Sequence, residues 1–153
     1  MKPVEIEPKT KAMIIGRSIN INGLYGLKPY TYKITAGSEN GDLVEIPGST
    51  AVELKAKGLG TMKITVQDKM GNTADASIEV KDELKIYAPP LMVQTNGNIN
   101  ITSEGGIPPY TFSATGGTLT VISNVATATG PASAKLKAPN SPTSIPVKVT
   151  DSE

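Results

Sequence analysis

The stretch Gly26-Leu27-Lys28-Pro29-Tyr30-Thr31-Tyr32 recurs 80 residues later as Gly106-Ile107-Pro108-Pro109-Tyr110-Thr111-Phe112. At the same offset Val4-Glu5-Ile6 matches Leu84-Lys85-Ile86, and Ile19-Asn20-Ile21 matches Ile99-Asn100-Ile101. A long internal repeat of this kind decides the architecture before any other pattern is considered. The sequence therefore predicts two copies of one small domain, at residues 1–80 and 81–153.

Composition excludes several classes of function. The net charge of +1 over 153 residues gives no basis for binding nucleic acid, and no apolar stretch is long enough for membrane insertion. There is no Cys and no His, which removes disulfides, thiolate chemistry and the commonest general base. The acidic residues fall on outward strand positions or in loops. We therefore expect no enzyme activity and no organic cofactor.

Alternation with a period of two predicts an all-β fold, with about seven short strands in the first copy at the spacing of a β-sandwich. The repeated motif feeds one of these strands. We expect its rings, Tyr30, Tyr32, Tyr110 and Phe112, at the centre of each core, with the hydroxyls reaching a polar rim. Gly26 and Gly106 permit an unusual backbone conformation at the turn, and Pro29 and Pro109 fix φ beyond it.

The second copy is incomplete. Val147–Asp151 matches Ile64–Asp68, but nothing corresponds to the last predicted strand of the first copy, Thr73–Val80. Either the chain is a fragment of a longer repeat array, which we favour, or another chain supplies the strand. The junction Lys81-Asp82-Glu83 contains no Gly/Ser-rich tether, so we expect a restricted angle between the domains.

A family resemblance follows from these residues. The motif Gly-x-x-Pro-Tyr-Thr-(Tyr/Phe), followed by Val-x-Asp and a Gly-containing turn, resembles the Ig-like repeats of bacterial surface proteins. It is similar to the SprB-type repeats of gliding adhesins and to the Ig-like and PKD-like modules of large secreted proteins. The resemblance implies two tandem Ig-like β-sandwiches on the exterior of a bacterium, or of a virus that infects one.

Two kinds of binding site have candidate residues. Asp68 with Asn72, or Glu39 with Asp42, offer loop oxygens to a calcium ion, although a calcium site needs six to eight oxygens. We favour the alternative that Asp68 and Asn72 form hydrogen bonds within their turn. For a surface glycan, Tyr25 and Tyr87 are the aromatic candidates outside the core pattern, and packing at the junction is the alternative.

The pattern favours a non-catalytic structural or stalk module of an adhesin-like surface or secreted protein, which spaces or presents a binding domain. Its partners would be neighbouring Ig-like domains and a protein or glycan on another surface. An alternative is a subunit of a fibre, pilus-like or phage tail assembly that takes a donor strand from its neighbour at the open edge. A second alternative is a carbohydrate-binding module.

Overall fold

The computed structural model describes residues 2–88, 95–125, 131–141 and 143–152. It divides the chain into two compact units, unit 1 (Met1–Asp82) and unit 2 (Glu83–Glu153). The division lies two residues beyond the predicted boundary, because the last strand of unit 1 continues through Lys81. No helix among the described residues has the length and apolar character needed to cross a membrane.

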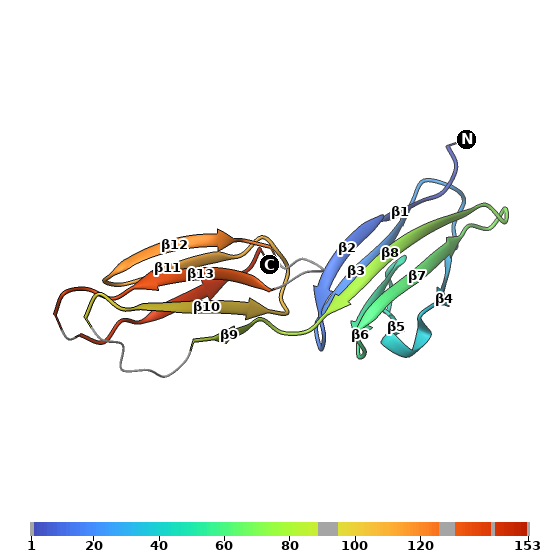
Figure 1. Cartoon of the computed structure of the whole chain (residues 1–153). Helices are drawn as coiled ribbons and strands as arrows, with labels where there is room; N and C mark the ends of the chain where they lie inside the picture. Colours follow the sequence, from blue (N-terminus) through green and yellow to red (C-terminus); the bar gives the residue numbers. More distant parts are fainter. Residues whose placement is uncertain (1, 89–94, 126–130, 142, 153) are drawn as a thin grey trace. The chain divides into compact units, whose positions relative to one another are not determined.

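Unit 1 is a sandwich of two sheets with strand orders β1-β3-β6-β5 and β2-β8-β7-β4 (Figure 1). The elements are β1 (Glu5–Glu7), β2 (Thr10–Ile14), β3 (Ser18–Leu24), β4 (Thr31–Ala36), the 3-10 helix η1 (Ser38–Asn40), β5 (Gly41–Glu45), β6 (Ala51–Ala56), β7 (Gly60–Gln67) and β8 (Thr73–Lys81). The chain passes from the first sheet to the second at Pro8, between β1 and β2, and β2 then pairs parallel with β8. These strand orders are those of an immunoglobulin-like sandwich.

Branched and linear aliphatic side chains fill the centre of unit 1. Ile21, Leu54, Met62, Ile64 and Ile78 are completely buried, at alternating positions on β3, β6, β7 and β8. The inward face of each strand therefore supplies every second residue, as the period-two pattern predicts.

The expected place of the two tyrosines of unit 1 needs correction. Tyr30 and Tyr32 are half-buried and pack against the edge of the core instead of forming its centre. At this edge the Tyr30 hydroxyl donates to the carbonyl of Tyr25, and the Tyr32 hydroxyl donates to the carbonyl of Thr50.

Unit 2 repeats the plan, with fewer strands among its described residues. Its sheets have the orders β12-β13-β10-β9 and β11-β14. The strands are β9 (Lys85–Tyr87), β10 (Asn98–Glu104), β11 (Thr111–Ala114), β12 (Thr118–Ser123), β13 (Ala132–Lys137) and β14 (Val147–Thr150). Tyr110 and Phe112 are 5% and 7% exposed and join Ile101 and Leu136 in the core, as expected for this copy.

The second sheet of unit 2 has an open edge. In unit 1, β7 lies between β4 and β8, whereas among the described residues its counterpart β14 pairs with β11 alone. The inward residues of β14, Val147 and Val149, are half-buried. Both units are Ig-like β-sandwiches, and the described residues of the second contain no counterpart of the last strand, β8, so the predicted fold class is confirmed.

Candidate functional site

The repeated motif forms the same turn in both units. Gly26 has φ 58° and Gly106 has φ 66°, in the left-handed region that favours glycine. The Lys28–Pro29 and Pro108–Pro109 peptide bonds are both cis. The motif therefore specifies one backbone path twice, leading into β4 in unit 1 and into β11 in unit 2.

Asp68, which is 5% exposed, holds the turn of unit 1 in place. Its Oδ1 accepts the amide hydrogens of Met70 and Asn72, both at 2.9 Å. Its Oδ2 accepts the amide of Leu27 at 3.2 Å and the side-chain amide of Asn72 at 3.0 Å. A Cβ on Gly26 would lie 2.8 Å from that Oδ2, so glycine is required by close approach as well as by φ.

Asp151 has the same relation to the turn of unit 2. Its Oδ2 accepts the amide hydrogen of Ile107 at 3.0 Å, and a Cβ on Gly106 would lie 2.5 Å from that oxygen. Sequence reasoning noted the Asp in each copy without assigning it this role. The available signal was that both copies carry Val-x-Asp as well as the motif.

The calcium candidates are engaged with protein donors. The pKa of the Asp68 carboxyl is lowered, first by the side-chain amide of Asn72 and further by the backbone amides of Asn72, Leu27 and Met70, which together outweigh the opposite effect of desolvation. Four N–H groups point at the oxygens that a cation would take, which is the arrangement of a turn-stabilising carboxylate.

The second candidate pair is not brought together as a ligand set. Asp42 lies at the start of β5, and its Oδ1 is 2.7 Å from the ammonium of Lys57. Glu39 lies in η1. The described residues contain no group of three or more His, Cys, Asp or Glu side chains that could hold a metal ion. Calcium binding at Asp68 and Asn72 or at Glu39 and Asp42 stays a prediction.

The two tyrosines considered for glycan binding are exposed. Tyr25 and Tyr87 are 50% and 51% exposed, in unit 1 and unit 2 respectively. The ammonium of Lys2 lies 3.4 Å from the centroid of the Tyr25 ring, so one face of that ring already has a cationic partner. Glycan binding at these two residues stays a prediction.

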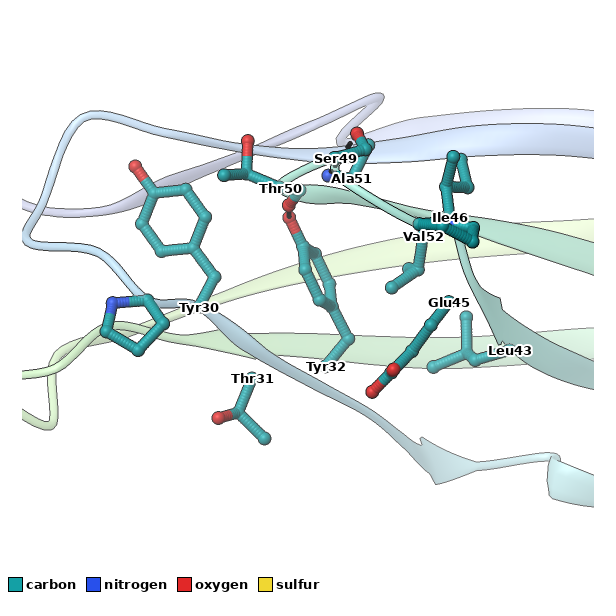
Figure 2. A pocket seen from close by; sticks show the side chains of 13 residues that line it. Tyr30, Thr31, Tyr32, Leu43, Glu45, Ile46, Ser49, Thr50, Ala51 and Val52 are labelled. Atoms are coloured by element: carbon teal, nitrogen blue, oxygen red, sulfur yellow. Dashed lines mark hydrogen bonds between the residues drawn. The ribbon is translucent and has the colours of Figure 1, made fainter.

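Unit 1 contains a groove of about 630 Å³ between β4 and the β5–β6 hairpin, which sequence reasoning did not foresee. Figure 2 shows the rings of Tyr30 and Tyr32 on one side of it and Leu43, Ile46 and Val52 on the other. Its volume lies within the range of small-molecule sites, about 300–1,000 Å³. The groove is therefore a concave site with both aromatic and aliphatic walls.

Backbone hydrogen bonds fix the two rings. The Tyr32 hydroxyl donates to the Thr50 carbonyl at 2.7 Å and accepts the Gly23 amide at 2.6 Å. The Tyr30 hydroxyl donates to the carbonyl of Tyr25. Burial raises the pKa of Tyr32, so its hydroxyl remains protonated at neutral pH. The wall of the groove is thus preformed.

The corresponding place in unit 2 is arranged differently. Phe112 stands where unit 1 has Tyr32, and Ser103 stands where it has Gly23. The segment after β12 also approaches the motif, because the Asn124 carbonyl accepts the amide hydrogen of Tyr110 at 2.7 Å. The chain of unit 2 thus contacts the motif where unit 1 has a groove.

Comparison with known proteins finds no family model and no curated protein that matches this chain. Solved structures do match. An eight-Ig-domain fragment of the Down syndrome cell adhesion molecule is 12% identical, with a TM-score of 0.45, covering 97% of this chain and 27% of that one. A titin I9–I11 tandem is 9% identical, with a TM-score of 0.37, covering 92% and 56%.

Bovine butyrophilin is 10% identical, with a TM-score of 0.42, covering 99% of this chain and 93% of that one. All of these TM-scores lie below 0.5, so the Ig-like assignment rests on the strand order within each unit. This chain spans about a quarter of the cell adhesion fragment and about half of the titin tandem.

Proposed function

We propose that the chain is a non-catalytic structural module of a larger adhesin-like protein, exposed on a bacterial surface, secreted, or on a virion. Its two Ig-like units act as a spacer that presents a binding domain. The observation that carries the proposal is the junction: β8 ends at Lys81 and β9 begins at Lys85, so only three residues join two sandwiches built on one motif. The resemblance of that motif to bacterial surface repeats supports the exterior location.

A spacer needs a restricted angle between its units, and a junction of three residues restricts it, because so short a chain explores far fewer arrangements than a long flexible linker. The experiment measures this property directly. Spin labels on cysteines introduced at the exposed residues Met70 and Asn140 report the distance distribution between the units, and the absence of native cysteines keeps the labelling specific.

The matched control carries six Gly/Ser residues inserted between Asp82 and Glu83. We expect a narrow distance distribution for the native chain and a broad one for the control. Equal widths would mean that the junction imposes no restriction, and the spacer function would then fail.

A second candidate function rests on the open edge of β14. An unpaired strand edge beside half-buried apolar residues is a template for another strand. The strand comes either from residues that follow in a longer chain or from a second molecule, in which case the protein is an assembly subunit.

Light scattering over a wide concentration range, with and without a peptide copied from Thr73–Val80, separates these cases. Oligomers that the peptide dissolves would support assembly by strand exchange. A monomer at all concentrations that binds the peptide would support completion within one longer chain. A monomer that ignores the peptide would remove this function.

A further inference from the structure

The groove of unit 1 lies between two free strand edges. Within the described chain, β4 pairs with β7 only and β5 pairs with β6 only, and each is the last strand of its sheet. Both edges border the groove, because its lining includes Thr31 and Tyr32 of β4 and Leu43 and Glu45 of β5. Free edges present unpaired backbone groups, which an extended peptide can satisfy.

In unit 2 a described residue that follows β12 contacts the motif at this place. There the connection between the corresponding strands, β12 and β13, spans residues 124–131, whereas the connection between β5 and β6 spans only 46–50. The longer connection begins with Asn124, whose carbonyl accepts the amide hydrogen of Tyr110, and Tyr110 is only 5% exposed.

The equivalent amide in unit 1 has no such partner. Among the described residues no backbone carbonyl accepts the amide hydrogen of Tyr30, and its ring is half-buried. The two units therefore share one motif and differ in whether a peptide segment lies against it. In unit 2 the partner of this amide is a backbone carbonyl, which an extended peptide would also supply in unit 1.

The charge of the groove lining indicates which side chains an occupant would carry. Glu45 is the only charged residue in the lining, and it takes part in none of the ion pairs among the described residues. Figure 2 shows its carboxylate directed from β5 toward β4. A basic side chain on the occupant would complement it, whereas an acidic one would be repelled.

We propose that the groove of unit 1 is a binding site for an extended peptide segment of a partner protein that carries a Lys or Arg residue. A backbone carbonyl of the peptide accepts the amide hydrogen of Tyr30, as the Asn124 carbonyl accepts that of Tyr110. Its apolar side chains contact the rings of Tyr30 and Tyr32 and the aliphatic wall, and its cation pairs with Glu45. This site gives the spacer a contact of its own, independent of any domain that it presents.

The probes are two synthetic peptides built on Thr120–Val125, Lys-Thr-Val-Ile-Ser-Asn-Val-Lys and its counterpart with Glu at both ends. Titration into the ¹⁵N-labelled full chain is followed by NMR. We expect the amide signal of Tyr30 and the signals of residues 45–50 to shift, with the Lys peptide binding about threefold or more tighter than the Glu peptide, as one exposed ion pair allows.

The charge-swap variant Glu45→Lys reverses this preference if the assignment of Glu45 is right. Glu39→Lys, outside the groove in the same unit, is the matched control and should leave the order unchanged. Unaltered spectra elsewhere in unit 1 establish that each variant is folded. The controls separate the groove from a general charge effect.

Three results would overturn the proposal. The first is no shift at Tyr30 with either peptide at millimolar concentration, and the second is a peptide order that Glu45→Lys does not change. The third is a shift at the groove with a panel of cello-, chito- and galacto-oligosaccharides but with neither peptide, which would assign the groove to a sugar instead.

Discussion

The carboxylate of Asp151 accepts the amide hydrogen of Ile107 at 3.0 Å, across 44 residues of chain. The same bond joins Asp68 to Leu27 in unit 1, at 3.2 Å. Each ties the loop that follows one strand of the second sheet to the turn that leads into its neighbour. The motif turn is therefore anchored by a residue far away in sequence, and this explains why Val-x-Asp and the Gly-Pro-Tyr motif occur together in both copies.

Acid should weaken unit 1 through Asp68. Its pKa is lowered from the ordinary value of 3.8 by the Asn72 side chain and by backbone amides, so its hydrogen bonds stabilise the fold above that pH. This contribution is lost as the pH falls through the lowered folded-state pKa. We expect Asp68→Asn to reduce the melting temperature at pH 7 and to reduce the further loss of stability between pH 4 and pH 2.

Circular dichroism melts between pH 2 and pH 7 measure this effect. Asp42→Asn is the matched control, because that carboxylate is exposed and pairs only with Lys57. Asp75 also has a lowered pKa, mainly from Lys63, and contributes equally to the acid sensitivity of both variants. Parallel pH curves for the native protein and Asp68→Asn would contradict the assigned role of Asp68.

Glycine is required at the turn for two reasons, its positive φ and the close approach of neighbouring atoms, and the two can be measured separately. Gly26 and Gly48 both have positive φ, 58° and 76°, but a Cβ on Gly26 would meet Asp68 and Val4 while one on Gly48 meets nothing within 4 Å. We expect Gly48→Ala to cost about 1–2 kcal/mol from φ alone and Gly26→Ala about 1–3 kcal/mol more, by urea denaturation. Equal costs would mean that the turn yields freely around Asp68.

Sequence patterning was sufficient for the repeat, the strands and the open edge, because these depend on local alternation and on matching residues between copies. It placed Gly26 and Gly106 correctly at turns of positive φ. It could not show the bond from Asp68 to Leu27, because no local pattern specifies which residues meet across 41 positions.

Sequence patterning also misplaced two tyrosines and did not reveal the groove, for physical reasons. The scarcity of aromatic residues suggested that Tyr30 and Tyr32 form the centre of the core, but both rings are half-buried at its edge, where they line the groove. The groove was not foreseen because its shape depends on how the edges of β4 and β5 and the connection 46–50 lie in three dimensions, which no local pattern specifies.

The two units differ at two neighbouring positions: unit 1 has Gly23 and Tyr32, where unit 2 has Ser103 and Phe112. A Cβ on Gly23 would lie 3.0 Å from the Tyr32 hydroxyl and 2.7 Å from the Tyr30 ring, whereas Phe112 has no hydroxyl and Ser103 is completely buried. We expect Gly23→Ser to cost about 1–3 kcal/mol and Tyr32→Phe about 0.5–1.5 kcal/mol. The double variant should cost at least about 0.5 kcal/mol less than the two single costs together.

Urea denaturation of the four proteins completes this cycle. A double variant whose cost equals the sum of the single costs would mean that the two positions are independent. The exchange between the copies would then have no explanation in the contact between residues 23 and 32.

Hydrogen exchange should distinguish β14 from β7. Amides of β7 lie between two paired strands, whereas β14 is paired on one side only among the described residues. Strands with fewer buried contacts open more readily. We expect β14 to exchange at least about tenfold faster than β7, a ratio that corresponds to 1.4 kcal/mol. Adding the Thr73–Val80 peptide should slow exchange in β14 and leave β7 unchanged, and uniform protection across both strands would show that the edge of β14 is already covered.

Phe112→Ala should unfold unit 2 while unit 1 remains folded. Phe112 is 7% exposed in a core that has, among the described residues, fewer buried members than that of unit 1, and removing a buried ring of this size costs about 3–5 kcal/mol. Because a sandwich of this size is only marginally stable, that loss removes most of its stability.

The measurement is an NMR spectrum at 25 °C, in which the signals of unit 2 should collapse to unfolded positions while those of unit 1 persist. Tyr87→Ala, at a residue that is 51% exposed on β9, is the control and should leave both sets intact. Loss of both sets of signals in Phe112→Ala would show that the two units fold as one, and the division at Asp82 would then have no thermodynamic meaning.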